Sequence, residues 1–312
     1  MFIDRLVGKI KYLNNPTVAG LDPKIDFVPK FIRDEKFDMF GETLQGASEA
    51  ILEFNMGIID SIYDIVPAVK PQLAYYEMFG ANGIWAFEET VAYAKSKGML
   101  VIADGKRNDI GSTSEAYSNA FLGETKISDT VLLKAFDADA LTVNPYLGID
   151  GIKPFIADCN THDKGIFVLV KTSNPSSGQL QDLILADGRR IFDAVAQLVV
   201  EWGSELVGKC GYSSVGAVVG ATWPSQAAEL RAMMPKAYFL VPGYGAQGGT
   251  AKDIAVNFNS DGLGAIVNAS RTLMCAYQSD MWKNQFSEKD YGQACRAEAL
   301  RMKEDINSYI GG

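Results

Sequence analysis

The chain contains the stretch Met99-Leu100-Val101-Ile102-Ala103-Asp104-Gly105-Lys106-Arg107-Asn108-Asp109. Its apolar part, residues 99–103, is typical of a strand buried in a parallel sheet. Side chains two residues apart on a strand share a face, so Asp104 and Lys106 are expected to project together from its carboxyl end. Charges at the end of a buried strand are costly unless they pair or take part in chemistry. The stretch therefore predicts a charged site at a sheet edge, and a solvated charged loop is the alternative.

The composition is that of a globular protein. The chain has 312 residues, of which 47% are hydrophobic, and a formal net charge of −9. This charge argues against a broad nucleic-acid interface, which needs a basic face. The 4 cysteines are widely spaced and predict reduced thiols in a cytoplasmic protein. The chain has 1 histidine, His162. Because zinc sites and serine or cysteine triads depend on histidine, neither kind of site is expected.

The first 15 residues form an amphipathic pattern. Apolar residues recur at helical spacing between Phe2 and Leu13, which predicts a helix packed on the body of the protein. Acidic Asp4 and the absence of a long apolar core argue against a signal peptide. No apolar run approaches the roughly 18 residues that a membrane span needs, so no membrane contact is expected.

Short apolar runs alternate with helical patterns along the whole chain. The predicted strands are Thr17–Leu21, Val66–Val69, Leu100–Ala103, Ala140–Val143, Ile166–Val170, Val215–Val219, Tyr238–Val241 and Ala265–Val267. Strand and helix alternating in this way predict an α/β fold, a closed (β/α)₈ barrel formed by a single domain over residues 1–312. A doubly wound open sheet is the competing interpretation, but no G-x-G-x-x-G follows the first strand.

Two long irregular segments are predicted, at residues 23–39 and 174–188. Each follows a strand, so both are expected on the same rim of the barrel. Long loops at that rim often form lids or substrate walls, and plain surface insertions are the alternative.

Polar side chains stand at the ends of several predicted strands, and in a (β/α)₈ barrel these ends converge on one rim. They are Asp22, Lys70, Asp104, Lys106, Asp109, Lys171–Pro175, Pro242–Gly249 and Asn268–Arg271. A predicted array of two cations and two anions consists of Lys70, Asp104, Lys106 and Asp109. An ion-pair network without function is the alternative for this array.

A phosphate site is predicted on the rim opposite the array. The glycine-rich segment after the seventh strand allows backbone N–H groups to approach an anion, and Thr250 with Asp253 can cap the helix that follows. Arg271, after the eighth strand, presents a planar set of donors suited to phosphate oxygens. Barrels often bind phosphate with the loops after these two strands.

Together these motifs resemble the orotidine 5′-phosphate decarboxylase family. The matching segments are Gly20-Leu21-Asp22, Val69-Lys70-Pro71, Asp104-x-Lys106-x-x-Asp109-Ile110-x-x-Thr113, Thr172-Ser173-Asn174-Pro175, Pro242-Gly243-x-Gly245-Ala246-Gln247-x-Gly249 and the segment of Arg271. They follow one another over nearly the whole chain, and the long rim segments resemble the longer branch of the family. Gln72 stands where some relatives have asparagine, and its role is left open.

The resemblance implies decarboxylation of orotidine 5′-phosphate to uridine 5′-phosphate, a step of de novo pyrimidine biosynthesis, with no cofactor and no metal. Lys106 is the implied acid that protonates the C6 carbanion, and Lys70, Asp104 and Asp109 are its implied partners. The implied substrate contacts are Thr172 and Ser173 for the pyrimidine, Asp22 and Lys70 for the ribose, and Pro242, Gln247, Gly248 and Arg271 for the phosphate.

The resemblance also implies a homodimer with shared sites. Asp109, Ile110 and Thr113 are expected to enter the active site of the neighbouring subunit. Ser112, with Glu115 three residues later, is expected to cap the helix that carries them.

Two other functions remain open at this point. One is a sugar-phosphate decarboxylase of the 3-keto-gulonate 6-phosphate type, which shares the D-x-K-x-x-D pattern, uses Mg²⁺ and lacks a pyrimidine-binding segment. The other is a barrel that binds a phosphate ligand without catalysis. The segment at Thr172–Pro175 favours the nucleotide as substrate.

Overall fold

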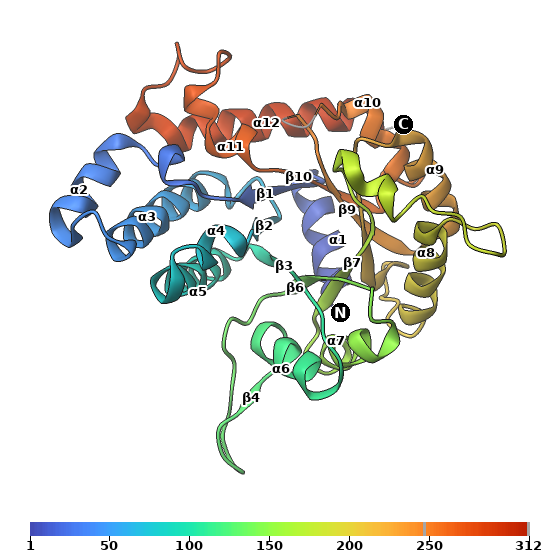
Figure 1. Ribbon diagram of the computed structural model, residues 1–312. Helices are drawn as coiled ribbons and strands as arrows, with labels where there is room; N and C mark the ends of the chain where they lie inside the picture. The colour runs from blue at the N-terminus through green and yellow to red at the C-terminus, as the bar shows by residue number, and fades with distance from the viewer. Residues whose placement is uncertain (246–247, 311–312) are drawn as a thin grey trace.

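Eight parallel strands close into a barrel in the computed structural model, which describes residues 1–245 and 248–310 (Figure 1). Around the barrel the strand order is β1-β10-β9-β8-β7-β6-β3-β2. The strands are β1 (Thr17–Leu21), β2 (Ala68–Pro71), β3 (Leu100–Arg107), β6 (Ala140–Val143), β7 (Gly165–Lys171), β8 (Ser213–Val219), β9 (Ala237–Pro242) and β10 (Ala265–Ala269). Barrel strands that follow one another along the chain are neighbours in the sheet, and the first strand, β1, pairs with the last, β10. The predicted (β/α)₈ barrel is therefore confirmed.

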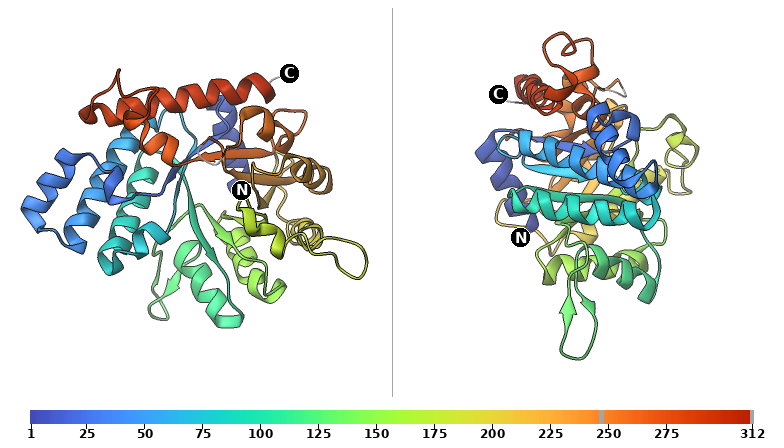
Figure 2. Two further views of the ribbon diagram at one scale, coloured as in Figure 1. Left: turned by 45° about the horizontal axis from the view of Figure 1, so that its top comes forward. Right: turned by 90° about the vertical axis from the view of Figure 1, so that its left-hand side faces the viewer.

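Helices surround the strands on the outside, as the two views of Figure 2 show. The longer ones are α2 (Lys30–Phe40), α3 (Leu44–Ile62), α5 (Gly80–Ser96), α6 (Gly111–Phe121), α7 (Ile149–Thr161), α8 (Ile191–Trp202), α9 (Pro224–Met233) and α12 (Tyr291–Ile310). Single turns form α4 (Ala74–Glu77), α10 (Ala251–Ile254) and α11 (Arg271–Met274). On α3 the residues at helical spacing, among them Ile51, Phe54 and Ile58, are buried against the barrel as the pattern predicts.

The N-terminal helix α1 (Phe2–Leu13) packs across the amino-terminal end of the barrel, as predicted. Its buried residues Phe2, Ile3, Leu6, Val7 and Ile10 join one cluster with side chains from inside the strands. The rings of Phe2 and Phe167 meet edge to face with centroids 6.3 Å apart. The side chains of α1 therefore cover the amino-terminal end of the barrel.

Two sequence-based expectations about the elements are wrong, and one element was missed. Residues 23–39 are not irregular, because a 3₁₀ turn (Ile25–Phe27) and most of α2 lie there. The second strand begins at Ala68 rather than Val66, since Pro67 has no N–H to offer the ladder. An antiparallel hairpin of β4 (Thr125–Lys126) and β5 (Leu132–Leu133) was not predicted, and it projects from the barrel beside α6 (Figure 1).

The segment 174–188 follows the carboxyl end of β7, as predicted, and starts with a 3₁₀ helix (Pro175–Gln179). Among the described residues, no helix has the length and apolar character needed to cross a membrane.

We expect Leu6→Ala to lower the free energy of unfolding by about 2–5 kcal/mol, because it leaves a cavity under the barrel floor. Leu6 is fully buried in the cluster that α1 forms with the strands. Tyr12→Ala is the matched control on the same helix, since Tyr12 is 88% exposed. Urea unfolding measures both, and a loss for Leu6→Ala no larger than that of the control would show that α1 adds no packing.

Candidate active site

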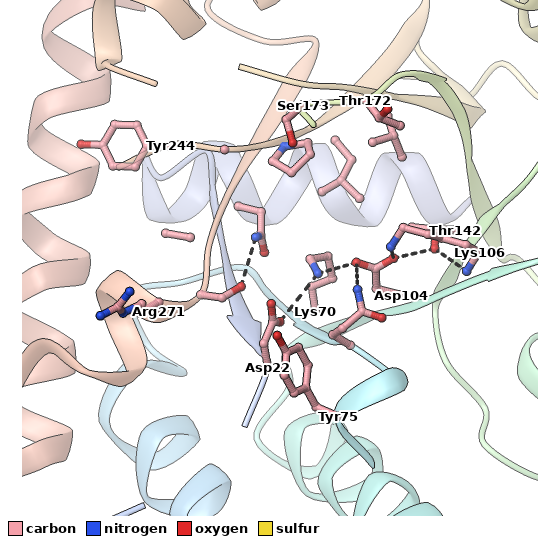
Figure 3. A pocket seen from close by; sticks show the side chains of 18 of the residues that line it. Asp22, Lys70, Tyr75, Asp104, Lys106, Thr142, Thr172, Ser173, Tyr244 and Arg271 are labelled. Carbon is pink, nitrogen blue, oxygen red and sulfur yellow. Dashed lines mark hydrogen bonds and ion pairs between the residues drawn. The ribbon is translucent and has the colours of Figure 1, made fainter. Parts of the chain in front are cut away.

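A cavity of about 540 Å³ opens at the carboxyl ends of the strands (Figure 3). The sequence-predicted residues that line it are Asp22, Lys70, Asp104, Lys106, Thr172, Ser173, Pro242 and Arg271. They come from β1, β2, β3, β7, β9 and β10 or from the segments directly after them. The barrel therefore brings together residues that are far apart in the sequence.

Asp104 lies between two ammonium groups. Lys70 Nζ donates to Asp104 Oδ2 at 2.6 Å, and Lys106 Nζ donates to Oδ1 of the same carboxylate at 2.6 Å. Asp22 Oδ1 lies 3.9 Å from Lys70 Nζ and continues the row. Lys70 and Asp104 are buried, whereas the Lys106 side chain is 45% exposed toward the cavity mouth. Asp22, Lys70, Asp104 and Lys106 thus form an alternating row of anions and cations within one chain.

Two neutral side chains complete the environment of Asp104. Gln72 Nε2 donates to Oδ2 at 2.9 Å, and the Thr142 hydroxyl donates to Oδ1 at 2.8 Å. Both carboxylate oxygens are thus doubly hydrogen-bonded, which holds the group in one orientation. This assigns a role to Gln72. Thr142 was missed by the sequence analysis, although a lone hydroxyl in the apolar strand Ala140–Val143 is a signal for it.

The backbone of β3 is irregular where Lys106 lies. Lys106 has φ +48°, which is rare for a residue other than glycine, and the β3–β6 register shifts between Ala103 and Arg107. The Lys106 N–H donates to Thr142 Oγ1 at 2.9 Å and so stabilises this conformation. The side chains of Asp104 and Lys106 do meet as predicted. Their contact depends on a bulge in β3, however, and not on the regular alternation of side chains along a strand.

The cavity holds charges that stabilise one another. Burial raises the pKa of Asp104, but Lys70 and Lys106 together lower it well below the usual carboxyl value. Burial opposes the charge of Lys70 as well, and the carboxylates of Asp104 and Asp22 nevertheless raise its pKa above 10.5. At neutral pH Asp104 is an anion and Lys70 a cation.

The opposite side of the cavity carries the predicted phosphate residues. Arg271 begins α11 and is exposed at the cavity wall, across from Lys106 in Figure 3. Thr250 and Asp253 form the predicted reciprocal cap of α10. Gly248 has φ +90° and is exposed but does not line the cavity. Gln247 lies outside the described residues.

Thr172 and Ser173 follow β7 and face the cavity. The Thr172 amide and hydroxyl are both bonded to Gln181, at 3.0 and 2.8 Å. The Ser173 carbonyl accepts from the Thr222 hydroxyl at 2.9 Å. Among the described residues, the Ser173 N–H and hydroxyl have no hydrogen-bond partner, so both can serve a ligand.

Asp109, Ile110 and Thr113 do not line the cavity of their own chain. Asp109 Oδ1 accepts from the Ile110 N–H, and Ile110 is 58% exposed. The expected cap by Ser112 is wrong: α6 begins at Gly111, so Ser112 lies within its first turn and Ile110 takes the cap position without a side-chain bond.

Within residues 1–245 and 248–310, no three His, Cys, Asp or Glu side chains are grouped so that they could hold a metal ion. The cation-rich cavity has the opposite character: Lys70, Lys106 and Arg271 suit an anionic ligand with two separate negative groups.

Comparison with known proteins gives one consistent family. The family model described as "Orotidine 5′-phosphate decarboxylase / HUMPS family" matches residues 47–279. Orotidine 5′-phosphate decarboxylases of Caldicellulosiruptor bescii and Rhodopirellula baltica are each 41% identical to this chain, over 99% and 98% of both sequences. The structure of OMP decarboxylase from Leishmania donovani is 29% identical, with a TM-score of 0.74, and covers 100% of this chain and 99% of that one.

We expect Asp104→Asn to destabilise the fold by about 3–5 kcal/mol at neutral pH, because it leaves the Lys70 ammonium buried without its nearest carboxylate. Burial should then lower the pKa of Lys70 below 10.5. If the pKa of Lys70 is lower in the folded than in the unfolded protein, folding is penalised as long as Lys70 is protonated in the unfolded chain. This penalty should therefore shrink as the pH rises toward 10.5, where the unfolded chain loses the proton.

In the wild-type protein the contribution of the pair to stability should not change with pH between about 6 and 10. Its contribution is complete above pH 3.8 for Asp104 and below pH 10.5 for Lys70. Urea unfolding of both proteins between about pH 6 and 10 tests this, with Asp280→Asn, an exposed carboxylate, as the control. A cost that stays constant over this range would contradict the electrostatic interpretation.

Proposed function

Because the chain belongs to the orotidine 5′-phosphate decarboxylase family, we propose that it converts orotidine 5′-phosphate to uridine 5′-phosphate and CO₂. The observation that carries the proposal is the Asp22–Lys70–Asp104–Lys106 row inside a cavity whose other side holds Arg271. Such a cavity suits a molecule with a carboxylate at one end and a phosphate at the other.

The reaction breaks the bond between C6 and the carboxylate carbon. CO₂ departs, and the electron pair stays on C6 in the plane of the ring, where the π system does not delocalise it. A proton from Lys106 Nζ then forms the C6–H bond, and the resulting neutral amine regains a proton from water. Lys106 is the exposed ammonium of the row and therefore the one that a ligand can reach.

Charge stabilisation is the larger part of the catalysis. Proton transfer by a placed acid contributes about 10²–10⁴-fold. Enzymes as a class lower barriers by about 8–23 kcal/mol, which acid catalysis alone does not supply. A cation held in place before the reaction stabilises the developing carbanion without reorganisation. Asp104, bonded to Lys70, Gln72 and Thr142 besides Lys106, supports such a fixed placement.

The remaining predicted residues bind the unreactive parts of the substrate. Arg271, Pro242, Gln247 and Gly248 are proposed for the phosphate, and Asp22 with Lys70 for the ribose hydroxyls. Thr172 and Ser173 are proposed for the pyrimidine edge. Binding energy gained at the phosphate, far from C6, can close the site and exclude water, which raises the rate as well as the affinity.

We further propose that the chain acts as a single-domain enzyme in the cytoplasm. The four cysteines, Cys159, Cys210, Cys275 and Cys295, are all free thiols, which supports a reducing compartment.

We expect Lys106→Ala to lower kcat at least about 10²-fold, because it removes both the proton donor and the positive charge. The measurement is the absorbance change of orotidine 5′-phosphate in EDTA-treated enzyme, with Lys283→Ala, an exposed lysine that pairs with Asp280, as the control. Activity of the wild type that disappears with EDTA would favour a Mg²⁺-dependent sugar-phosphate decarboxylase. Binding without turnover would favour a phosphate-binding barrel.

We also propose a two-fold dimer in which Asp109, Ile110 and Thr113 reach the partner's site. Exposed apolar side chains support this, because they stand just before α6, on the β4–β5 hairpin, and just before and at the start of α7. These are Ile110, Ile127, Val131, Leu132, Leu133, Tyr146, Leu147 and Ile149. An apolar surface of this extent is typical of an interface between copies.

Mixing a Lys106→Ala chain with an Asp109→Ala chain should restore activity. Random exchange of subunits gives about half mixed dimers, and in each of them one site has both residues intact. Activity is measured after exchange and compared with each parent alone. Dimers that exchange subunits without any gain over the parents would refute shared sites.

A further inference from the structure

Lys171, the last residue of β7, carries a buried charge that the reaction does not use. Its side chain is almost completely inaccessible, and it does not line the cavity, although Leu169 and Thr172 on either side of it do. The β7–β8 register shifts between Leu169 and Lys171, which accounts for this departure from alternation. A buried ammonium outside the cavity needs a structural or positioning role.

The Lys171 ammonium is enclosed by two rings and one carboxylate. Its Nζ lies 5.3 Å from the ring centroid of Phe192 and 5.2 Å from that of Trp223. It donates to Asp182 Oδ1 at 2.7 Å, and Gln226 Nε2 donates to the same oxygen at 3.3 Å. Asp182 belongs to the rim segment 174–188, so the ion pair fastens that segment to the end of β7.

Gln181, which precedes Asp182 in the sequence, is hydrogen-bonded to Thr172, which follows Lys171. Gln181 accepts from the Thr172 N–H and donates to the Thr172 hydroxyl. Trp223, whose ring contacts the Lys171 ammonium, donates from Nε1 to the Thr172 carbonyl at 3.1 Å. The N–H and hydroxyl of Thr172 are thus held by Gln181 and its carbonyl by Trp223, and the hydroxyl also donates to Asn174 Oδ1 at 2.6 Å.

We propose that Lys171 is a positioning residue for recognition of the pyrimidine ring. Its ion pair with Asp182 places Gln181, and Gln181 with Trp223 fixes Thr172. The next residue, Ser173, is then left with a free N–H and hydroxyl directed to the base. The inference rests on the proposed function. We call the Lys171–Asp182 pair the anchor, and through it the rim segment 174–188 contributes to substrate recognition.

The test uses two ligands that differ in the base. Uridine 5′-phosphate contains ribose, phosphate and pyrimidine, whereas ribose 5-phosphate lacks the pyrimidine. For Lys171→Met we expect the inhibition constant of uridine 5′-phosphate and the KM of orotidine 5′-phosphate to rise about tenfold or more, since the base site is no longer preorganised. The inhibition constant of ribose 5-phosphate and kcat should change less than about threefold, because only uniform binding is lost.

Matched variants distinguish the anchor from general damage to the fold. Asp182→Asn should reproduce the selective loss, and Lys171→Arg, which keeps the charge, should recover most of it. The double variant Lys171→Met/Asp182→Asn should be no weaker than Lys171→Met alone. Asp187→Asn removes a carboxylate from the same segment that pairs with Arg189 instead, and it should bind both ligands as the wild type does.

An equal loss of affinity for both ligands, a fall in kcat with KM unchanged, or unaltered binding by Lys171→Met and Asp182→Asn would overturn the anchor. These outcomes leave the decarboxylase itself intact, because they are measured against an active wild type. A wild type that neither releases CO₂ nor binds uridine 5′-phosphate would overturn the proposed function and, with it, the anchor.

Discussion

The Asp104 carboxylate is the group on which the organisation of the cavity depends. It accepts hydrogen bonds from two ammonium groups, one amide and one hydroxyl, supplied by three different strands and the residue after β2. Removing this anion would leave Lys70 buried with only Asp22 at 3.9 Å. Two cations can stand this close together only because a fixed, fully bonded carboxylate lies between them.

The barrel provides the conditions for this arrangement. Parallel strands end on the same rim, so charged residues with wide separation in sequence arrive in one cavity. The packing of α1 covers the other end and buries apolar side chains of the strand interiors. In such surroundings, hydrogen-bonded charges stay fixed, and a fixed charge can stabilise a carbanion without the reorganisation that water would need.

Two local departures from regular strand geometry set the orientation of Lys106 and Lys171. The bulge in β3, with Lys106 in the left-handed region, brings an exposed ammonium above a buried carboxylate. The irregularity in β7 accompanies the turn of Lys171 away from the cavity, toward Asp182. Both lie at strand ends, where a strained residue or an extra residue does not interrupt the packing of the barrel core.

The sequence by itself determined the barrel, an N-terminal helix packed on it and the residues at the strand ends. Apolar runs of strand length and polar residues after them are local patterns, and the parallel topology follows from their alternation. Only the tertiary structure decided that Asp22 adjoins Lys70, that Gln72 and Thr142 bind Asp104, and that Lys171 pairs with Asp182. These are contacts between strands or between a strand and a distant part of a loop, and they depend on register, bulges and backbone twist, which no local pattern of side chains specifies.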